Sequence, residues 1–166
     1  MQFIDLKAQQ NRIKSKIDKR IQSVLAHGKY IMGPEVFELE EKLADYVGVK
    51  NCISCASGTD ALLIPLMAKN IGPGDAVITT PFTYIATAEV IALVGATPIF
   101  TDIYPETYNM NPEGIEKAVE EAKNKGLNPR AIIPVDLFGL PARYRVIEEL
   151  AMENHLFIIE DAAQGF

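Results

Sequence analysis

The amino-acid sequence predicts an α/β fold, in which a mostly parallel sheet is covered by helices on both faces. From residue 51 onward, short apolar runs alternate with stretches whose apolar residues recur at helical spacing. Apolar residues make up 48% of the 166 residues, which is enough for a substantial core. We therefore expect one domain over residues 1–166, with a helical segment at 1–50 and an alternating strand and helix region at 51–166.

Two amphipathic helices are expected in the first 50 residues. Apolar residues recur at helical spacing through residues 13–25, and Gly28 is the expected end of that helix. The pair Gly33-Pro34 opens the second helix, because proline is favoured in the first turn. Gly48 is its expected C-cap.

Strands and helices are expected to alternate after residue 50. The strands are expected at 52–56, 76–80, 98–102, 131–135 and 156–160. The helices are expected at 59–70, 85–94, 112–125 and 143–154. Because helices separate successive strands, the strands are expected to run parallel. The glycines and proline of residues 72–75 predict a turn before the second strand.

Charge and composition exclude several functional classes. Sixteen basic and 22 acidic residues give a net charge of −6, whereas nucleic-acid binding relies on clustered Lys and Arg. No apolar run approaches the roughly 18 residues of a membrane span, and the first residues do not have the pattern of a signal peptide. We expect a cytoplasmic protein that binds neither nucleic acid nor membranes.

The two cysteines, Cys52 and Cys55, form a single C-x-x-C motif. A redox or metal site of this type needs a helix start or a second ligand pair, and the sequence offers neither. Because both residues lie in the first expected strand, we predict buried, reduced structural thiols. No metal site is expected.

The segment Ser57-Gly58-Thr59-Asp60 follows the first expected strand and enters a helix directly. Ligands of open α/β sheets bind beyond the carboxyl ends of the strands. Free amides of Gly58, Thr59 and Asp60, together with the helix dipole, would favour a phosphate there. An ordinary helix N-cap at Ser57 or Thr59 explains the same pattern equally well. The segment is neither a P-loop nor a dinucleotide fingerprint.

Aromatic and acidic residues follow two other expected strands. Phe82 and Tyr84 offer a flat face for a heterocyclic ring, although packing of a helix on the sheet also explains them. Asp161 follows the apolar run at 156–159, where an unpaired carboxylate is costly. We expect a cationic partner for it, such as a protonated ring nitrogen. A helix N-cap or an internal ion pair is the alternative for Asp161.

The three strand ends match the three parts of pyridoxal phosphate (PLP), namely a phosphate, a flat ring and a pyridine nitrogen. A carboxylate on that nitrogen keeps it protonated, so the ring can act as an electron sink. Two alternatives remain at this point. One is a nucleotide-binding α/β module with a phosphate at Gly58 and Thr59, and the other is a non-catalytic scaffold.

Six segments resemble, in order, the DegT/DnrJ/EryC1/StrS family of sugar aminotransferases. They lie at residues 3–6, 28–34, 57–62, 72–75, 81–87 and 160–164. The resemblance implies the large domain of a fold type I PLP enzyme, present here in part. It also implies a homodimer that transfers an amino group, typically from glutamate, to a nucleotide-linked keto sugar. Such reactions serve cell-surface polysaccharide or amino-sugar biosynthesis.

The resemblance also implies individual roles. Gly58 and Thr59 match the residues that hold the cofactor phosphate. Tyr84 matches the aromatic residue that stacks on the pyridine ring. Asp161 matches the catalytic partner of the ring nitrogen, and Gln164 matches the residue near the ring hydroxyl.

The chain departs from the family pattern in two respects. Many members carry a histidine at the position of Asp136, which we expect to affect the substrate end of the site. Family members are also longer, and their Schiff-base lysine follows the segment that matches 160–164. Of the lysines in the sequence, only Lys29 lies in a segment expected near the site, and nothing suggests a lowered pKa for it. We therefore expect the chain alone to be inactive. With Tyr84 on the ring, Phe82 is expected to be a packing residue.

Overall fold

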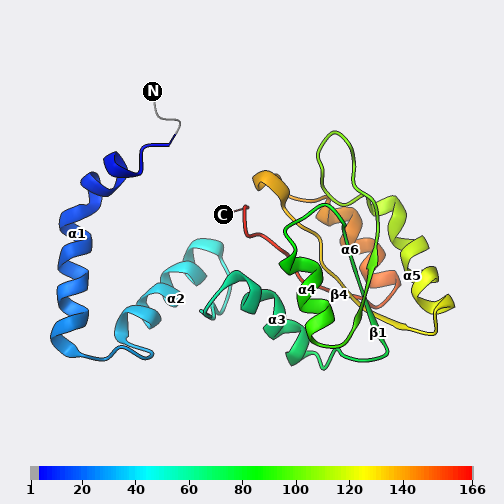
Figure 1. The fold of residues 1–166 in the computed structure, drawn as a ribbon, viewed down its shortest axis with the longest axis horizontal. Helices are drawn as coiled ribbons and strands as arrows, with labels where there is room; N and C mark the ends of the chain where they lie inside the picture. Colours follow the sequence, from blue (N-terminus) through cyan, green and yellow to red (C-terminus); the bar gives the residue numbers. More distant parts are fainter. Residues whose placement is uncertain (1–3, 166) are drawn as a thin grey trace. The chain divides into compact units, whose positions relative to one another are not determined.

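A computed structural model describes residues 4–165 of the chain. Phe3, in the first of the six family segments, and Phe166 lie outside the described residues. The chain divides into two compact units, Met1–Ser54 and Cys55–Phe166 (Figure 1). None of the helices in the described part is long and apolar enough to cross a membrane.

The first unit contains the two expected helices, and each one ends at the glycine that the sequence predicts. Helix α1 spans Leu6–His27 and ends at Gly28, whose φ of 66° is left-handed. Helix α2 spans Pro34–Val47 and ends at Gly48, whose φ is 77°. Glycine adopts this conformation without the steric cost that a Cβ brings, which explains why both helices end there.

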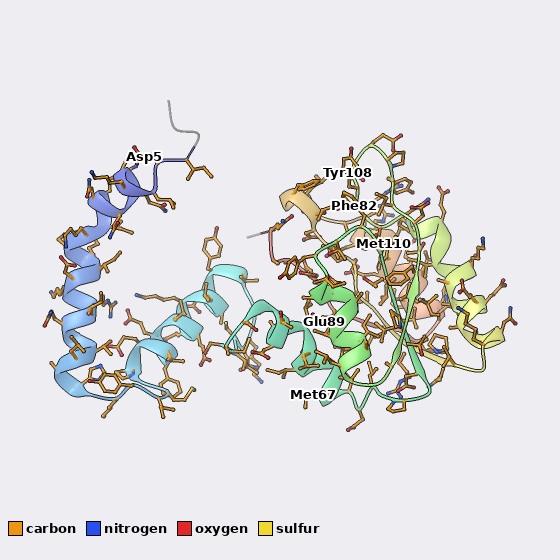
Figure 2. The ribbon with its side chains drawn as sticks, viewed as in Figure 1. Asp5, Met67, Phe82, Glu89, Tyr108 and Met110 are labelled. Carbon is orange, nitrogen blue, oxygen red and sulfur yellow. The ribbon has the colours of Figure 1, made fainter. Side chains whose placement is uncertain are left out.

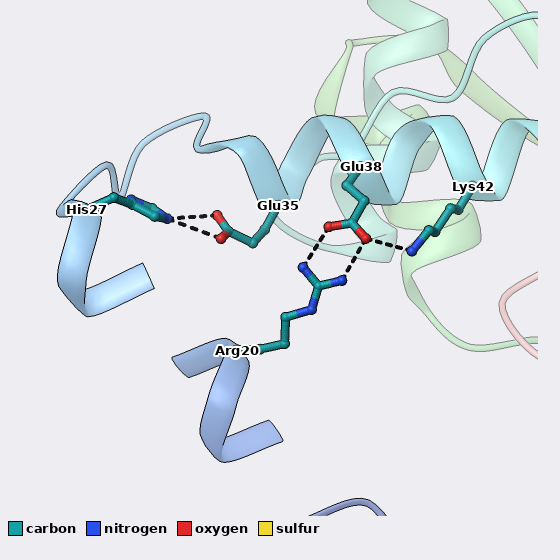
Figure 3. A network of polar contacts seen from close by, with 5 residues as sticks. All are labelled: Arg20, His27, Glu35, Glu38 and Lys42. Atoms are coloured by element: carbon teal, nitrogen blue, oxygen red, sulfur yellow. Dashed lines mark hydrogen bonds and ion pairs between the residues drawn. The ribbon is translucent and has the colours of Figure 1, made fainter. Parts of the chain in front are cut away.

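Charged side chains connect α1 to α2 (Figure 3). The Arg20 guanidinium donates to both carboxylate oxygens of Glu38, at 2.7 and 2.6 Å. Lys42 donates to Glu38 Oε1 at 2.6 Å, and His27 Nε2 lies 3.1 Å from Glu35 Oε1. Hydrogen bonds from Arg20, and then from Lys42, lower the pKa of the Glu38 carboxyl to about 2. Most of these groups are exposed, so the network contributes little to the stability of the fold.

The substitution Arg20→Gln is expected to raise the pKa of Glu38 from about 2 toward its ordinary value of 4.5. Because the folded-state pKa is lowered, the pairing is fully present above pH 4.5 and is lost as the pH falls through about 2. An NMR pH titration of the Glu38 carboxyl carbon measures this directly. Lys42→Gln should give a smaller rise, and an unchanged titration in Arg20→Gln would contradict the assignment.

The second unit is built on a four-stranded parallel sheet. Its strands are β1 (Asp75–Thr79), β2 (Thr97–Phe100), β3 (Asn128–Ile132) and β4 (Phe157–Ile158). They lie in the order β2-β1-β3-β4, so the central strand β1 pairs with both β2 and β3. The expected turn at 72–75 is present, with the Asp75 amide donating to the Gly72 carbonyl at 3.0 Å.

Helices cover both faces of this sheet, as predicted (Figure 1). The helices of this unit are α3 (Gly58–Ala68), α4 (Ala86–Leu93), α5 (Ile115–Asn124) and α6 (Tyr144–Glu153), with short 3-10 turns at Pro112–Gly114 and Leu137–Gly139. Alternate residues of β1 separate two cores. Ile78 packs with α5 and α6, whereas Val77 packs with α3 and α4. The predicted fold class is confirmed.

The expected strand at 52–56 is wrong, because these residues form no strand. They cross the boundary between the two units, and none of the four strands pairs with them. The prediction of two buried thiols fails with it. Cys52 is half-buried and Cys55 is exposed, and both are free. An apolar run specifies a strand only where a neighbouring strand can accept its hydrogen bonds.

Candidate functional site

A cavity of about 260 Å³ lies beyond the carboxyl ends of β1, β3 and β4. The first turn of α3 contributes to its wall, as do segments that follow each of the three strands. Its volume is just below the roughly 300–1,000 Å³ usual for small-molecule sites. The residues predicted from the sequence to hold a cofactor all line it, namely Gly58, Thr59, Tyr84, Asp161 and Gln164.

The N-terminus of α3 combines the two alternatives that the sequence left open. Ser57 is the N-cap, and its Oγ accepts a hydrogen bond from the Asp60 amide at 3.1 Å. The expectation that the Asp60 amide is free is therefore wrong. Gly58 and Thr59 occupy the first two positions of the helix, whose N–H groups have no acceptor within a helix. Those two amides and the positive end of the dipole remain for an anionic ligand.

Gly58 leaves open space at this helix end. A Cβ added to it would meet no atom within 4 Å, and its backbone does not need a positive φ. Neither packing nor backbone conformation of this chain therefore requires glycine at position 58. Close approach of a ligand to the backbone is a physical reason for glycine at such a position.

Asp161 is a buried carboxylate, with 7% of its surface exposed. Its backbone is held beside β3 by a parallel bridge to Val135. Oδ2 accepts a hydrogen bond from the Thr87 hydroxyl at 2.7 Å, while Oδ1 has only a long contact of 3.4 Å from the Ala163 amide. Within residues 4–165, no basic side chain forms an ion pair with it. Among the described residues, neither an internal ion pair nor a helix N-cap accounts for this acid.

Aromatic rings lie beside the cavity. Tyr84 lines it and remains 74% exposed, so its ring is available to a ligand. Phe82 does not line it and instead packs on Tyr108, with ring centroids 5.3 Å apart (Figure 2). The Tyr108 ring also makes an edge contact with Phe138 at 6.0 Å. Phe82 is therefore a packing residue in this structure.

Gln164 links two of the loops that border the cavity. Its Oε1 accepts a hydrogen bond from the Phe138 amide at 2.6 Å. Phe138 has a φ of 57°, a left-handed conformation that is uncommon for a residue with a Cβ. The contact with Gln164 helps to hold that conformation. Because the amide oxygen is engaged, the Gln164 NH₂ group is the end left to donate to a ligand.

Asp136 is 3% exposed, and its Oδ1 accepts two hydrogen bonds. Oδ1 accepts from the Ala142 amide at 2.9 Å and from the Tyr144 hydroxyl at 2.8 Å. Burial and the bond to Asp136 raise the pKa of Tyr144. Although much of Glu160 is exposed, desolvation and the neighbouring Asp136 carboxyl raise the pKa of its carboxyl group. The Glu160 carboxyl therefore ionises less readily than an isolated glutamate.

Glu160→Gln is expected to stabilise the fold at neutral pH and to have no effect below pH 4. Since the folded-state pKa of Glu160 is raised above 4.5, the folded state binds more protons. Stability therefore falls as the pH rises from 4.5 through the raised value. Thermal unfolding of the two proteins across this range measures the difference. Glu153→Gln, at an exposed position of α6, is the matched control for the change from carboxylate to amide. A constant offset at every pH would contradict the prediction.

The cavity also contains residues that sequence reasoning missed. Thr83 lines the cavity, and Thr87 lies fully buried behind it, in contact with Asp161. Thr83 lies in the bend before α4, and Thr87 lies four residues later in the first turn of that helix. That spacing is visible in the sequence, but the contact of Thr87 with Asp161 spans 74 positions. Only the fold brings these two residues together.

The donor set suits a ligand that carries an anionic group and a flat, positively charged ring. Two amides at a helix N-terminus, an exposed aromatic ring and a buried acid with no cationic partner among the described residues provide one contact for each part. A parallel sheet with such a cavity at its carboxyl edge defines the class of α/β proteins that bind ligands beyond their strand ends. The chain belongs to the DegT/DnrJ/EryC1/StrS aminotransferase family, whose model matches residues 11–166.

Individual relatives match nearly the whole chain. A UDP-2-acetamido-2-deoxy-3-oxo-D-glucuronate aminotransferase of Pseudomonas aeruginosa is 55% identical over 166 residues, which are 100% of this chain and 45% of that protein. The crystal structure of a DegT DnrJ EryC1 StrS aminotransferase from Brucella abortus superposes with a TM-score of 0.95 at 56% identity, over 99% of this chain and 44% of that one. The structure of NtdA from Bacillus subtilis, with bound cofactor PMP, gives a TM-score of 0.87 at 33% identity, over 94% and 34%.

The chain spans less than half the length of these relatives. The predicted family and the fold type I scaffold are confirmed. A nucleotide-binding module and a non-catalytic scaffold are not favoured.

Proposed function

We propose that the full-length protein is a PLP-dependent aminotransferase that transfers an amino group from an amino acid, typically glutamate, to the keto group of a nucleotide-linked sugar. One observation carries this proposal: five residues assigned from separate motifs line a single cavity. The name of the Pseudomonas aeruginosa relative, a UDP-linked keto-sugar aminotransferase, supports the substrate class. A cytoplasmic homodimer that serves amino-sugar or polysaccharide biosynthesis is part of the proposal.

Each lining residue has a distinct task in this proposal. The amides of Gly58 and Thr59, with the Thr59 hydroxyl, hold the cofactor phosphate. Tyr84 stacks on the ring, and the Gln164 NH₂ group donates to the ring hydroxyl. Asp161 binds the protonated ring nitrogen. When bound, the cofactor supplies an electron sink that stabilises a carbanion next to the transferred amine.

The described lining of the cavity bears on the covalent anchor of the cofactor. None of the residues that line it is a lysine. The Schiff-base lysine of the proposed enzyme, which acts as general acid and base on the substrate, is therefore not among the lining residues described. The chain contributes the binding of the cofactor and the electrostatic control of its ring.

A transamination assay tests the function. The full-length protein is loaded with PLP and mixed with glutamate and a UDP-linked 3-keto sugar, and 2-oxoglutarate and amino sugar are measured. Equal amounts of both products are expected. PLP binding with 2-oxoglutarate formation from glutamate alone, and no amination of any nucleotide-linked keto sugar, would overturn the proposed acceptor class. Absence of PLP binding would overturn the proposal as a whole.

A further inference from the structure

Thr87 of α4 is fully buried, and its hydroxyl lies at the centre of a small polar cluster. Its Oγ1 lies 2.7 Å from Asp161 Oδ2, 3.1 Å from the Tyr84 carbonyl and 2.9 Å from Thr83 Oγ1. A threonine hydroxyl has one proton to donate. The carboxylate is both the nearest acceptor and the charged one, so the proton is directed to Asp161.

This choice fixes the direction of the remaining hydrogen bond. With its proton committed to Asp161, Thr87 accepts through Oγ1, and Thr83 is the donor in the contact between the two hydroxyls. The result is a chain of hydroxyls that runs from Thr83 through Thr87 to Oδ2 of the acid. Hydrogen bonds in such chains polarise and strengthen one another.

The two oxygens of Asp161 are therefore not equivalent. Oδ2 is occupied by a short hydrogen bond from a buried donor, whereas in the described part of the chain Oδ1 has only the 3.4 Å contact from the Ala163 amide. A buried carboxylate is costly unless its oxygens have partners. Oδ1 is thus the oxygen that still lacks a strong partner, and Asp161 lines the cavity.

We propose that Thr87 is a positioning residue, whose hydroxyl holds Oδ2 of Asp161 so that Oδ1 faces the protonated ring nitrogen of the cofactor. This rests on the proposed function, because it takes Asp161 as the partner of that nitrogen. Thr83 supports the arrangement from one hydroxyl further away. Thr87 also has a purely local contact, to the Tyr84 carbonyl near the start of α4, so the test must separate the two roles.

The experiment compares two ligands in the full-length protein by calorimetric titration. One is pyridoxamine phosphate, and the other is its 1-deaza analogue, in which carbon replaces the ring nitrogen. Thr87→Val removes the hydroxyl and keeps the shape, and Thr87→Ser keeps the hydroxyl. We expect Thr87→Val to weaken the binding of pyridoxamine phosphate about tenfold, which is the loss typical of one hydrogen bond to a charged group. Thr87→Ser should restore the affinity, and the deaza analogue should bind all three proteins alike.

Any other outcome contradicts a specific step of the proposal. Equal weakening of both ligands in Thr87→Val would show that the hydroxyl only supports the local fold, and unchanged binding of both would show that it has no role. If the unsubstituted protein does not distinguish the two ligands, the ring-nitrogen contact of Asp161 fails, and the role of Thr87 fails with it. Failure to bind either ligand would overturn the proposed function. If Thr87→Val does not fold, Thr83→Val is used instead. It must weaken the binding of pyridoxamine phosphate, by a smaller factor, and leave the binding of the deaza analogue unchanged.

Discussion

Asp161→Asn in the full-length protein is expected to lower kcat by about 10²–10³-fold, the range found when one preorganised electrostatic contact is removed from an active site. The neutral amide cannot keep the ring nitrogen of the cofactor protonated, so the electron sink is weakened. The fold should tolerate the change, because asparagine has the same size and its side-chain oxygen can still accept from Thr87. Some cofactor binding should remain, since the phosphate contacts are untouched.

The measurement is kcat with saturating glutamate and keto-sugar acceptor, together with cofactor content by absorbance. Glu120→Gln on the exposed side of α5 is a matched control, because it makes the same change from carboxylate to amide outside the cavity. Near-normal turnover in Asp161→Asn would remove the assigned role of Asp161. Loss of folding would instead show that this acid is chiefly a structural group.

The helices could be predicted closely because local chemistry determines their ends. Gly28 and Gly48 adopt the left-handed conformation that terminates α1 and α2, and Pro34 occupies the first position of α2. The parallel sheet could also be predicted, since apolar runs separated by helices leave few other arrangements. Only the segment at 52–56 was misassigned, because a strand depends on a neighbouring strand that its own residues do not specify.

The site was predictable to the level of its motifs but not of its contacts. Tyr84 and Asp161 follow expected strands that are present, and the topology of a parallel sheet brings such strand ends to one edge. Gly58 also lines the cavity, although the strand expected before it is absent. Hydrogen bonds between distant segments, such as those of Thr87 with Asp161 and of Gln164 with Phe138, depend on side-chain geometry. The sequence offers no rule for these pairings. The capping of α3 by Ser57 likewise shows that a motif can serve the fold and still leave two amides for a ligand.

The substitution Gly58→Asp is expected to weaken the binding of pyridoxamine phosphate by at least tenfold, or about 1.4 kcal/mol. The stability of the fold should rise or stay unchanged. A Cβ at position 58 meets no atom within 4 Å, and an acidic side chain in the first turn of a helix is favourable by about 0.3–1 kcal/mol. The same negative charge would repel a bound phosphate, and two unit charges about 4 Å apart near a protein surface interact by ~4 kcal/mol. Stability and affinity are therefore expected to change in opposite directions.

This opposition separates a phosphate site from an ordinary helix start. Thermal unfolding without ligand reports the fold, and titration with pyridoxamine phosphate reports the site. Gly58→Ala distinguishes the effect of size from that of charge and should lose less affinity. Pyridoxamine, which lacks the phosphate, should bind Gly58→Asp and the unsubstituted protein alike. If Gly58→Asp weakens both ligands equally, the charge at position 58 does not act on a phosphate, and the N-terminus of α3 serves the fold alone.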